Sequence, residues 1–78
     1  MDFEYPVIDK KKMGDNLKRY MQERGLTARD VQEYLGLACV QTVYRWTAGI
    51  SIPTVDNLYA LSRLMNISID ALVGSKSN

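Results

Sequence analysis

The spacing of apolar residues predicts a helical chain from Met13 onward. Met13, Leu17, Tyr20 and Met21 recur at intervals of three and four residues, which is typical of one face of an amphipathic helix. The same periodicity continues through most of the sequence. It predicts five helices, at about 13–24, 28–35, 40–48, 55–65 and 69–73.

Residues that start and end helices lie at these predicted boundaries. Thr27, Thr54 and Ser68 each stand before a helix as an N-cap, and Asp30 nearly completes a capping box with Thr27. Helix-ending residues are expected at Gly25, Gly36, Gly49, Asn66 and Gly74. Because the caps agree with the periodicity, we predict an all-α fold.

The periodicity also predicts which side chains form the core. In the helix at 40–48, Val43 and Trp46 share the inner face. In the helix at 55–65, the inward stripe consists of Val55, Leu58, Leu61 and Met65.

The two ends of the chain differ from this pattern. Pro6 blocks a helix interior, so we expect an extended arm over residues 1–12, with a short strand packed on the body. Lys10–Lys12 is interpreted as a solvated linker, and the alternative is that this run adds positive charge if the arm folds toward DNA. The helical domain then covers 13–74, and residues 75–78 form a frayed tail.

Composition excludes several classes of function. The chain has 78 residues, which allows one small domain, and 46% of them are apolar, which is ordinary for a globular protein. It has no apolar run long enough to span a membrane, and its acidic N-terminus does not resemble a signal peptide. We therefore expect a cytoplasmic protein.

Candidate catalytic and metal-binding residues are scarce. The sequence has no His and a single Cys, so neither a catalytic triad nor a Cys/His zinc site is expected. The acidic residues are scattered, and none forms a pair suited to acid/base catalysis. We predict no enzyme activity, no cofactor and no metal.

The segment from Thr27 to Gly49 reads as a helix, a tight glycine turn and a second helix. This is a helix-turn-helix pattern, in which the second helix fits the major groove of DNA and the first supports it. The lone Cys39 lies in the turn. Oxidation of a Cys39 thiolate would switch DNA binding off. The simpler interpretation is that Cys39 is a small residue that fills the turn.

Residues 13–73 resemble the Cro/repressor (Xre-type) helix-turn-helix domains of phages and bacteria. The matching stretches, in chain order, are NLKRYMQERGLT, YLGL, VYRW and NLYALSRLMNISIDALV. A subgroup of small regulators from Gram-positive bacteria is more similar still, because its turn is also one residue longer than usual. The resemblance implies a five-helix bundle that binds operator DNA, usually as a homodimer, and here as a repressor.

Helix geometry indicates which residues face the DNA. If Val43 and Trp46 face the core, the opposite face of that helix carries Gln41, Tyr44 and Arg45. Gln suits adenine and Arg suits guanine in the major groove. We expect base contacts from Gln41, Thr42 and Arg45, and contacts to the DNA backbone from Thr27, Arg29, Tyr44 and Ser51. A merely solvated helix face is the alternative interpretation.

The sequence departs from the family at several positions. A Gln that often contacts a phosphate is Ala28 here, and Arg29 is a possible substitute. A small residue within the same helix is Gln32, whose side chain must point outward unless the helices pack further apart. An Arg–Glu ion pair found in many members corresponds to Met21 and Thr47, which reads as an apolar replacement.

Charge leaves a second class of function open. The net charge is +1, and residues 49–53 carry no cation, so we expect few ion pairs to DNA and a shallow salt dependence. The alternative is a protein-interaction module, or an antitoxin-like partner, with the same fold and weak DNA affinity. Candidate dimer surfaces are the C-terminal helix and the apolar residues of the arm, namely Phe3, Tyr5, Val7 and Ile8.

Overall fold

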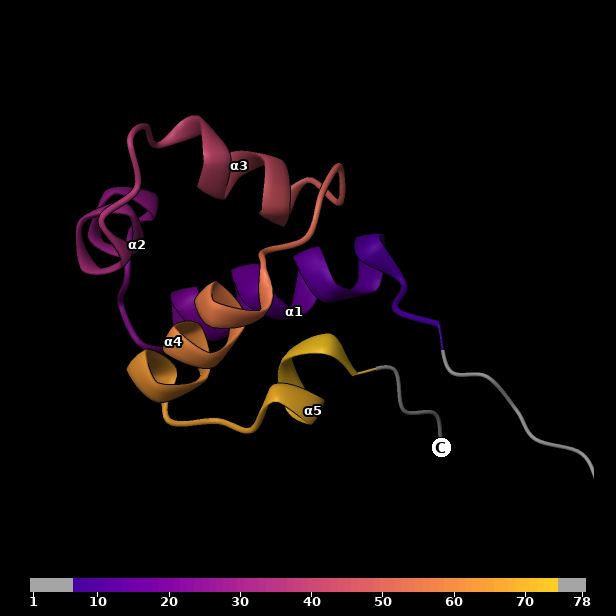
Figure 1. The fold of residues 1–78 in the computed structure, drawn as a ribbon. Helices are drawn as coiled ribbons and strands as arrows, with labels where there is room; N and C mark the ends of the chain where they lie inside the picture. The colour runs from indigo at the N-terminus through magenta and orange to yellow at the C-terminus, as the bar shows by residue number, and fades with distance from the viewer. Residues whose placement is uncertain (1–6, 75–78) are drawn as a thin grey trace, which may run out of the picture.

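Five helices form the part of the chain that the structure describes. The computed structural model describes residues 7–74, and no strand is present within that range. The helices are α1 (Lys10–Glu23), α2 (Ala28–Leu35), α3 (Gln41–Thr47), α4 (Val55–Met65) and α5 (Ile69–Val73). In Figure 1, α1 lies between α3 and α5, and it contacts both. The predicted all-α fold is confirmed.

The helix ends follow the capping residues of the sequence. Thr27 and Ser68 accept backbone hydrogen bonds as N-caps of α2 and α5. Thr54 stands at the N-cap of α4, but its hydroxyl donates to Asp56 instead of accepting from the backbone. Left-handed backbone conformations, with φ between 57° and 77°, are found at Gly25, Gly36, Gly49 and Asn66.

Helix α1 begins three residues before the predicted position. Asp9 is its N-cap, and the Asp9 carboxylate accepts a hydrogen bond of 3.1 Å from the backbone N–H of Lys12. The prediction that Lys10–Lys12 form a linker is therefore wrong, because these lysines make the first turn of α1. The apolar periodicity starts only at Met13, whereas the polar cap sets the start of the helix.

Only a short part of the predicted arm precedes α1 in the described range. Residues 7–9 are neither helix nor strand, so the expected strand is not found there. Val7 and Ile8 are exposed. The other two apolar residues of the arm, Phe3 and Tyr5, lie outside the described residues, as does the predicted tail at 75–78.

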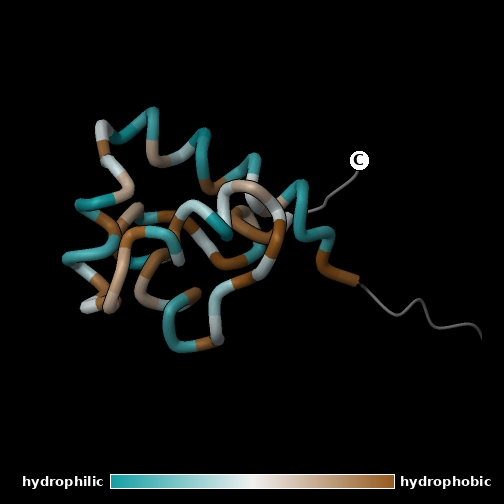
Figure 2. Tube along the Cα trace, turned by 90° about the horizontal axis from the view of Figure 1, so that it is seen from above, coloured by the Kyte–Doolittle hydropathy of each residue, from teal (hydrophilic) through white to brown (hydrophobic). Residues whose placement is uncertain are grey.

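The core is formed by side chains from all five helices. Apolar residues alternate with polar ones along the helices (Figure 2). No helix within 7–74 is both long enough and apolar enough to cross a membrane. The buried apolar residues are Met13, Leu17, Met21, Val31, Val43, Trp46, Leu58, Leu61, Met65 and Leu72.

One predicted core residue lies on the surface. Val55 is 79% exposed, although it continues the apolar stripe of α4 at the correct spacing. It is the first residue of α4, whereas Pro53, two residues earlier in the loop, is buried. The apolar stripe of α4 is therefore covered only from Leu58 onward.

A glycine allows α1 and α3 to approach closely. Gly14 is buried in α1, and a Cβ atom at this position would lie 2.6 Å from the carbonyl oxygen of Trp46 and 2.8 Å from that of Thr47. Any side chain would thus collide with the backbone of α3. Gly14 was not identified from the sequence, although an isolated glycine within a helical pattern often has a packing reason.

A side chain of α1 and the side chain of its C-cap, Arg24, bind carbonyl groups at the C-terminal ends of α5 and α4. The Asn16 amide donates to the Leu72 carbonyl over 3.1 Å. The Arg24 guanidinium donates to the Met65 carbonyl over 2.6 Å. Helix α1 is therefore held on one side by α3 and on the other by α4 and α5, which fixes the position of α3.

Candidate nucleic-acid interface

Helices α2 and α3 form a helix-turn-helix unit around a glycine turn. Helix α2 ends at Leu35, Gly36 takes the left-handed conformation with φ of 69°, and α3 begins at Gln41. The turn is fastened by Gln32, whose amide donates to the Leu37 carbonyl over 3.2 Å. The half-buried Gln32 side chain thus bends back onto the turn, a role that the sequence did not suggest.

Helix α3 has one buried face and one exposed face. Val43 is completely buried and Trp46 is 4% exposed, as predicted. On the opposite side, Gln41, Tyr44 and Arg45 are exposed. The two buried side chains anchor the helix, so the exposed polar side chains project from a fixed backbone.

Thr42 is less accessible than its neighbours on α3. It is half-buried, and its hydroxyl lies 3.7 Å from the sulfur of Cys39. Hydrogen bonds from Thr42 lower the pKa of the exposed Cys39 thiol below its ordinary value. The contact fixes the Thr42 hydroxyl at the edge of the exposed face.

The start of α2 lies beside α3 and carries free hydrogen-bond donors. The Thr27 side chain and the Asp30 backbone are joined in a capping box. Within residues 7–74, the N–H groups of Ala28 and Arg29 have no hydrogen-bond partner, as is normal for the first turn of a helix. Arg29 is exposed, so one cation accompanies these donors.

The loop between α3 and α4 folds back onto α3. The backbone N–H groups of Ile50 and Ser51 donate to the carbonyl of Arg45 over 2.9 and 3.4 Å. Ser51 is half-buried, while Ile50 and Ile52 are exposed. No charged side chain occurs between Ala48 and Thr54.

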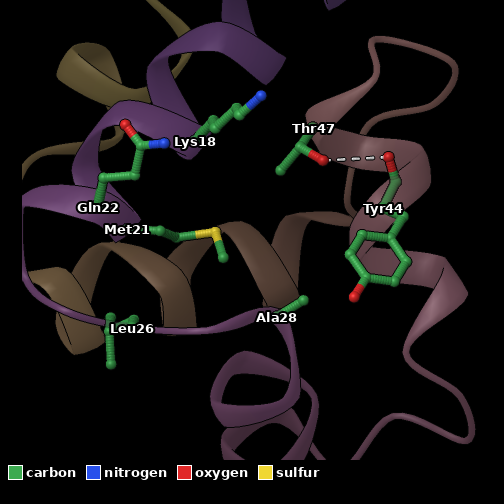
Figure 3. Close-up of a pocket in the computed structure, with 7 residues that line it drawn as sticks. All are labelled: Lys18, Met21, Gln22, Leu26, Ala28, Tyr44 and Thr47. Carbon is green, nitrogen blue, oxygen red and sulfur yellow. Dashed lines mark hydrogen bonds between the residues drawn. The ribbon is translucent and has the colours of Figure 1, made fainter.

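A cavity of about 320 Å³ opens between α1, the start of α2 and α3. Figure 3 shows Met21, Ala28 and Thr47 on its walls, so three positions that depart from the family line one cavity. The Thr47 hydroxyl donates to the Tyr44 carbonyl over 3.1 Å. Lys18 also lines the cavity, and it was not identified from the sequence.

Comparison with known proteins agrees with this geometry. A family described as Helix-turn-helix matches residues 17–72. Among solved structures, the chain is similar to the crystal structure of a transcriptional regulator from Listeria innocua, with 30% sequence identity and a TM-score of 0.76. The similarity covers 85% of this chain and 61% of that one, so the chain spans less than two thirds of the Listeria protein. No curated protein matches the chain.

These findings also bear on the class of protein. Within residues 7–74, no group of three or more His, Cys, Asp or Glu side chains is placed to hold a metal ion. The matched family is described as Helix-turn-helix and the similar structure is that of a transcriptional regulator, which agrees with the prediction of no enzyme activity. The match extends from α1 through α5, and the chain belongs to the helix-turn-helix family of the Cro/repressor type.

Proposed function

We propose that the chain is a sequence-specific DNA-binding transcriptional regulator that represses its target and inserts α3 into the major groove. The observation that carries this proposal is the exposed polar face of α3, which lies opposite the buried Val43 and Trp46. Because Val43 and Trp46 hold the inner face of α3 against the core, its exposed side chains can contact base edges while the helix stays packed.

Gln41, Thr42 and Arg45 are the residues we assign to base recognition. Gln41 is the first residue of α3, from which an amide reaches the N6 and N7 atoms of adenine. Arg45 lies one turn further along the same exposed face, and its guanidinium pairs with O6 and N7 of guanine. Thr42 reads a base from the edge of the face.

Thr27, Arg29, Tyr44 and Ser51 are assigned to the DNA backbone. The Thr27 hydroxyl oxygen accepts from the Asp30 N–H, and its O–H can turn from the Asp30 carboxylate to donate to a phosphate. Arg29 adds a cation beside the unpaired N–H groups of α2. The exposed Tyr44 hydroxyl donates from the middle of α3, and the half-buried Ser51 side chain donates from the loop that follows α3.

The proposed regulator acts as a homodimer on a two-fold operator. Two copies of α3 would then lie about 34 Å apart, which is one turn of DNA. This arrangement doubles the contact area of a small domain and explains how a chain with a net charge of +1 achieves specific binding. A DNA target also implies a cytoplasmic location.

The test begins with a titration of backbone amide signals against a random-sequence duplex at low and higher salt. Salt-sensitive shifts are expected in residues 27–30, 38–48 and 50–52. An operator is then selected from random DNA with the wild-type chain. Arg45→Ala and Gln41→Ala are each expected to lose about 1–3 kcal/mol of discrimination at one base pair.

Arg63→Ala is the matched control for Arg45→Ala. Arg63 is an exposed arginine in the last turn of α4, where its guanidinium stacks over Tyr59 at 5.9 Å. The control is expected to bind the operator as the wild type does. Absence of shifts at a DNA concentration above the roughly 10⁻⁴ M typical of weak non-specific binding would reject the DNA-binding proposal.

One observation favours the second candidate, a protein-interaction module. The loop after α3 and the outer face of α4 expose apolar side chains where phosphate contacts would otherwise be expected. Ile50 is 54% exposed, Val55 79% and Tyr59 57%. If the titration leaves α3 unchanged, this apolar surface is where a partner protein is expected to bind.

A further inference from the structure

We propose that Lys11 and Lys18 form a phosphate-binding stripe on α1 that runs beside α3. This inference rests on the proposed DNA-binding function, and it concerns a helix to which no DNA contact has been assigned. It places on α1 the cations that the loop after α3 lacks.

Gly14 defines which face of α1 lies against α3. Residues 11, 14 and 18 are spaced by three and four, so Lys11 and Lys18 flank Gly14 on one face of the helix. The carbonyl oxygens of Trp46 and Thr47 lie against Gly14. The two lysines therefore lie on the part of α1 that is nearest to α3.

Each lysine has its own contact near α3. A Cβ atom at Gly49 would lie 2.9 Å from the Cα atom of Lys11, so Lys11 borders the C-terminal end of α3. Lys18 lines the cavity together with Tyr44 and Thr47, and all three are drawn in Figure 3. The rise between the two lysine positions is about 10 Å, close to the width of a major groove of about 12 Å.

Both ammonium groups are available to a phosphate. The Lys11 ammonium has an ion pair with Asp15 at 3.8 Å, and the two side chains are 74% and 62% exposed. A pair at that distance in solvent is weak and is readily exchanged for another anion. Lys18 is exposed and forms no salt bridge with any residue between 7 and 74.

The first turn of α1 is an unfavourable place for lysines in the free protein. It carries Lys10, Lys11 and Lys12 and no acidic residue, although the positive end of the helix dipole favours acidic side chains. A phosphate bound beside this turn would reverse the unfavourable interaction. The same reasoning predicts that removing the Lys11 charge does not destabilise the free domain.

The test compares the salt dependence of duplex binding among matched variants. Lys11→Gln/Lys18→Gln removes the stripe. Lys12→Gln/Arg19→Gln removes the same charge from the opposite side of α1, since residues 12 and 19 lie about 160° and 140° around the helix from Gly14. Affinity for a short random-sequence duplex is measured by fluorescence anisotropy from low to moderate salt, and folding is checked by circular dichroism and thermal melting.

The stripe variant is expected to bind more weakly at low salt, with a slope of log K against log salt that is shallower by about 1.8, or about 0.9 for each phosphate lost. The control, Lys12→Gln/Arg19→Gln, is expected to keep the wild-type slope. Lys11→Arg/Lys18→Arg retains both positive charges of the stripe and is expected to keep that slope as well. If the stripe variant keeps the wild-type slope, or the control changes equally, the stripe is rejected while DNA binding stands. If the wild-type chain binds no duplex, the proposed function and the stripe both fail.

Discussion

At the scale of single residues, Thr27 and Asp30 determine where the helix that supports α3 begins. The Asp30 N–H donates to the Thr27 hydroxyl oxygen over 3.1 Å, and the Thr27 N–H donates to the Asp30 carboxylate over 2.9 Å. The backbone hydrogen bond from Thr27, aided by its side chain, lowers the pKa of Asp30 below the ordinary value of 3.8. The capping box therefore depends on the ionised form of Asp30.

This dependence predicts how stability changes in acid. Because the pKa of Asp30 is lower in the folded chain than in the unfolded chain, its contribution to stability is fully present above the unfolded pKa of 3.8 and is lost as the pH falls through the folded pKa. At pH 7, Asp30→Asn is expected to have a lower melting temperature than the wild type. On acidification its melting temperature is expected to fall by less than that of the wild type. Thermal melts from pH 7 to below pH 3 check this. Parallel curves for variant and wild type would show that the box contributes no pH dependence.

At the scale of helices, the elements were more predictable than their packing. The predicted ranges 28–35, 55–65 and 69–73 agree with α2, α4 and α5, because caps and apolar periodicity are both local properties. Periodicity misplaced the start of α1, and it put Val55 in the core because it cannot tell where the body of the molecule ends.

The candidate site, like the fold, could be predicted from the sequence only in part. The exposed face of α3 followed from the two inward residues Val43 and Trp46, which are local in sequence. The nearness of Lys11 and Lys18 to α3 did not, since it depends on how two helices far apart in the chain are packed. The DNA contacts assigned to individual side chains stay predictions.

The packing of α1 on α3 makes Gly14 the residue whose substitution is most informative. Gly to Ala in a helix normally stabilises by about 0.5–1 kcal/mol. Here the new Cβ atom would meet two backbone carbonyl oxygens closer than 3 Å, so Gly14→Ala is expected to cost about 1–3 kcal/mol. Urea unfolding measures this, with the exposed Glu33→Ala as a control within about 0.5 kcal/mol. A stabilised Gly14→Ala chain would show that the two helices can separate without loss.

At the scale of the whole molecule, charge is distributed unevenly around α3. The net charge is +1, yet Arg29 and Arg45 are exposed on α2 and α3, and Lys11 and Lys18 flank α3 on α1. Several acidic residues lie at the starts of helices, where they cap the helix or complement its dipole. They are Asp9, Asp30, Asp56 and Asp70. A nearly neutral chain can therefore present a cationic face, and the sum of its charges is a poor guide to its partner.

The exposed apolar residues before α1 bear on how two copies of the chain assemble. We predict that the wild-type chain dimerises and that a variant lacking residues 1–8 dimerises at least tenfold more weakly. The deletion removes the exposed Val7 and Ile8 but leaves Asp9 to cap α1, so the domain itself is expected to remain folded. Sedimentation velocity over a range of protein concentrations measures the association.

The competing dimer surface is α5, and a second variant separates the two. Asp70 is exposed in the first turn of α5, and Asp70→Lys places an opposite charge on that surface without touching the arm. If the arm is the interface, this variant dimerises as the wild type does and the truncated chain dimerises at least tenfold more weakly. The reverse result assigns the interface to α5. A chain that sediments as a monomer at every concentration, and that binds a full operator no more tightly than a half-site, contradicts the homodimer, because two linked recognition helices must bind more tightly than one.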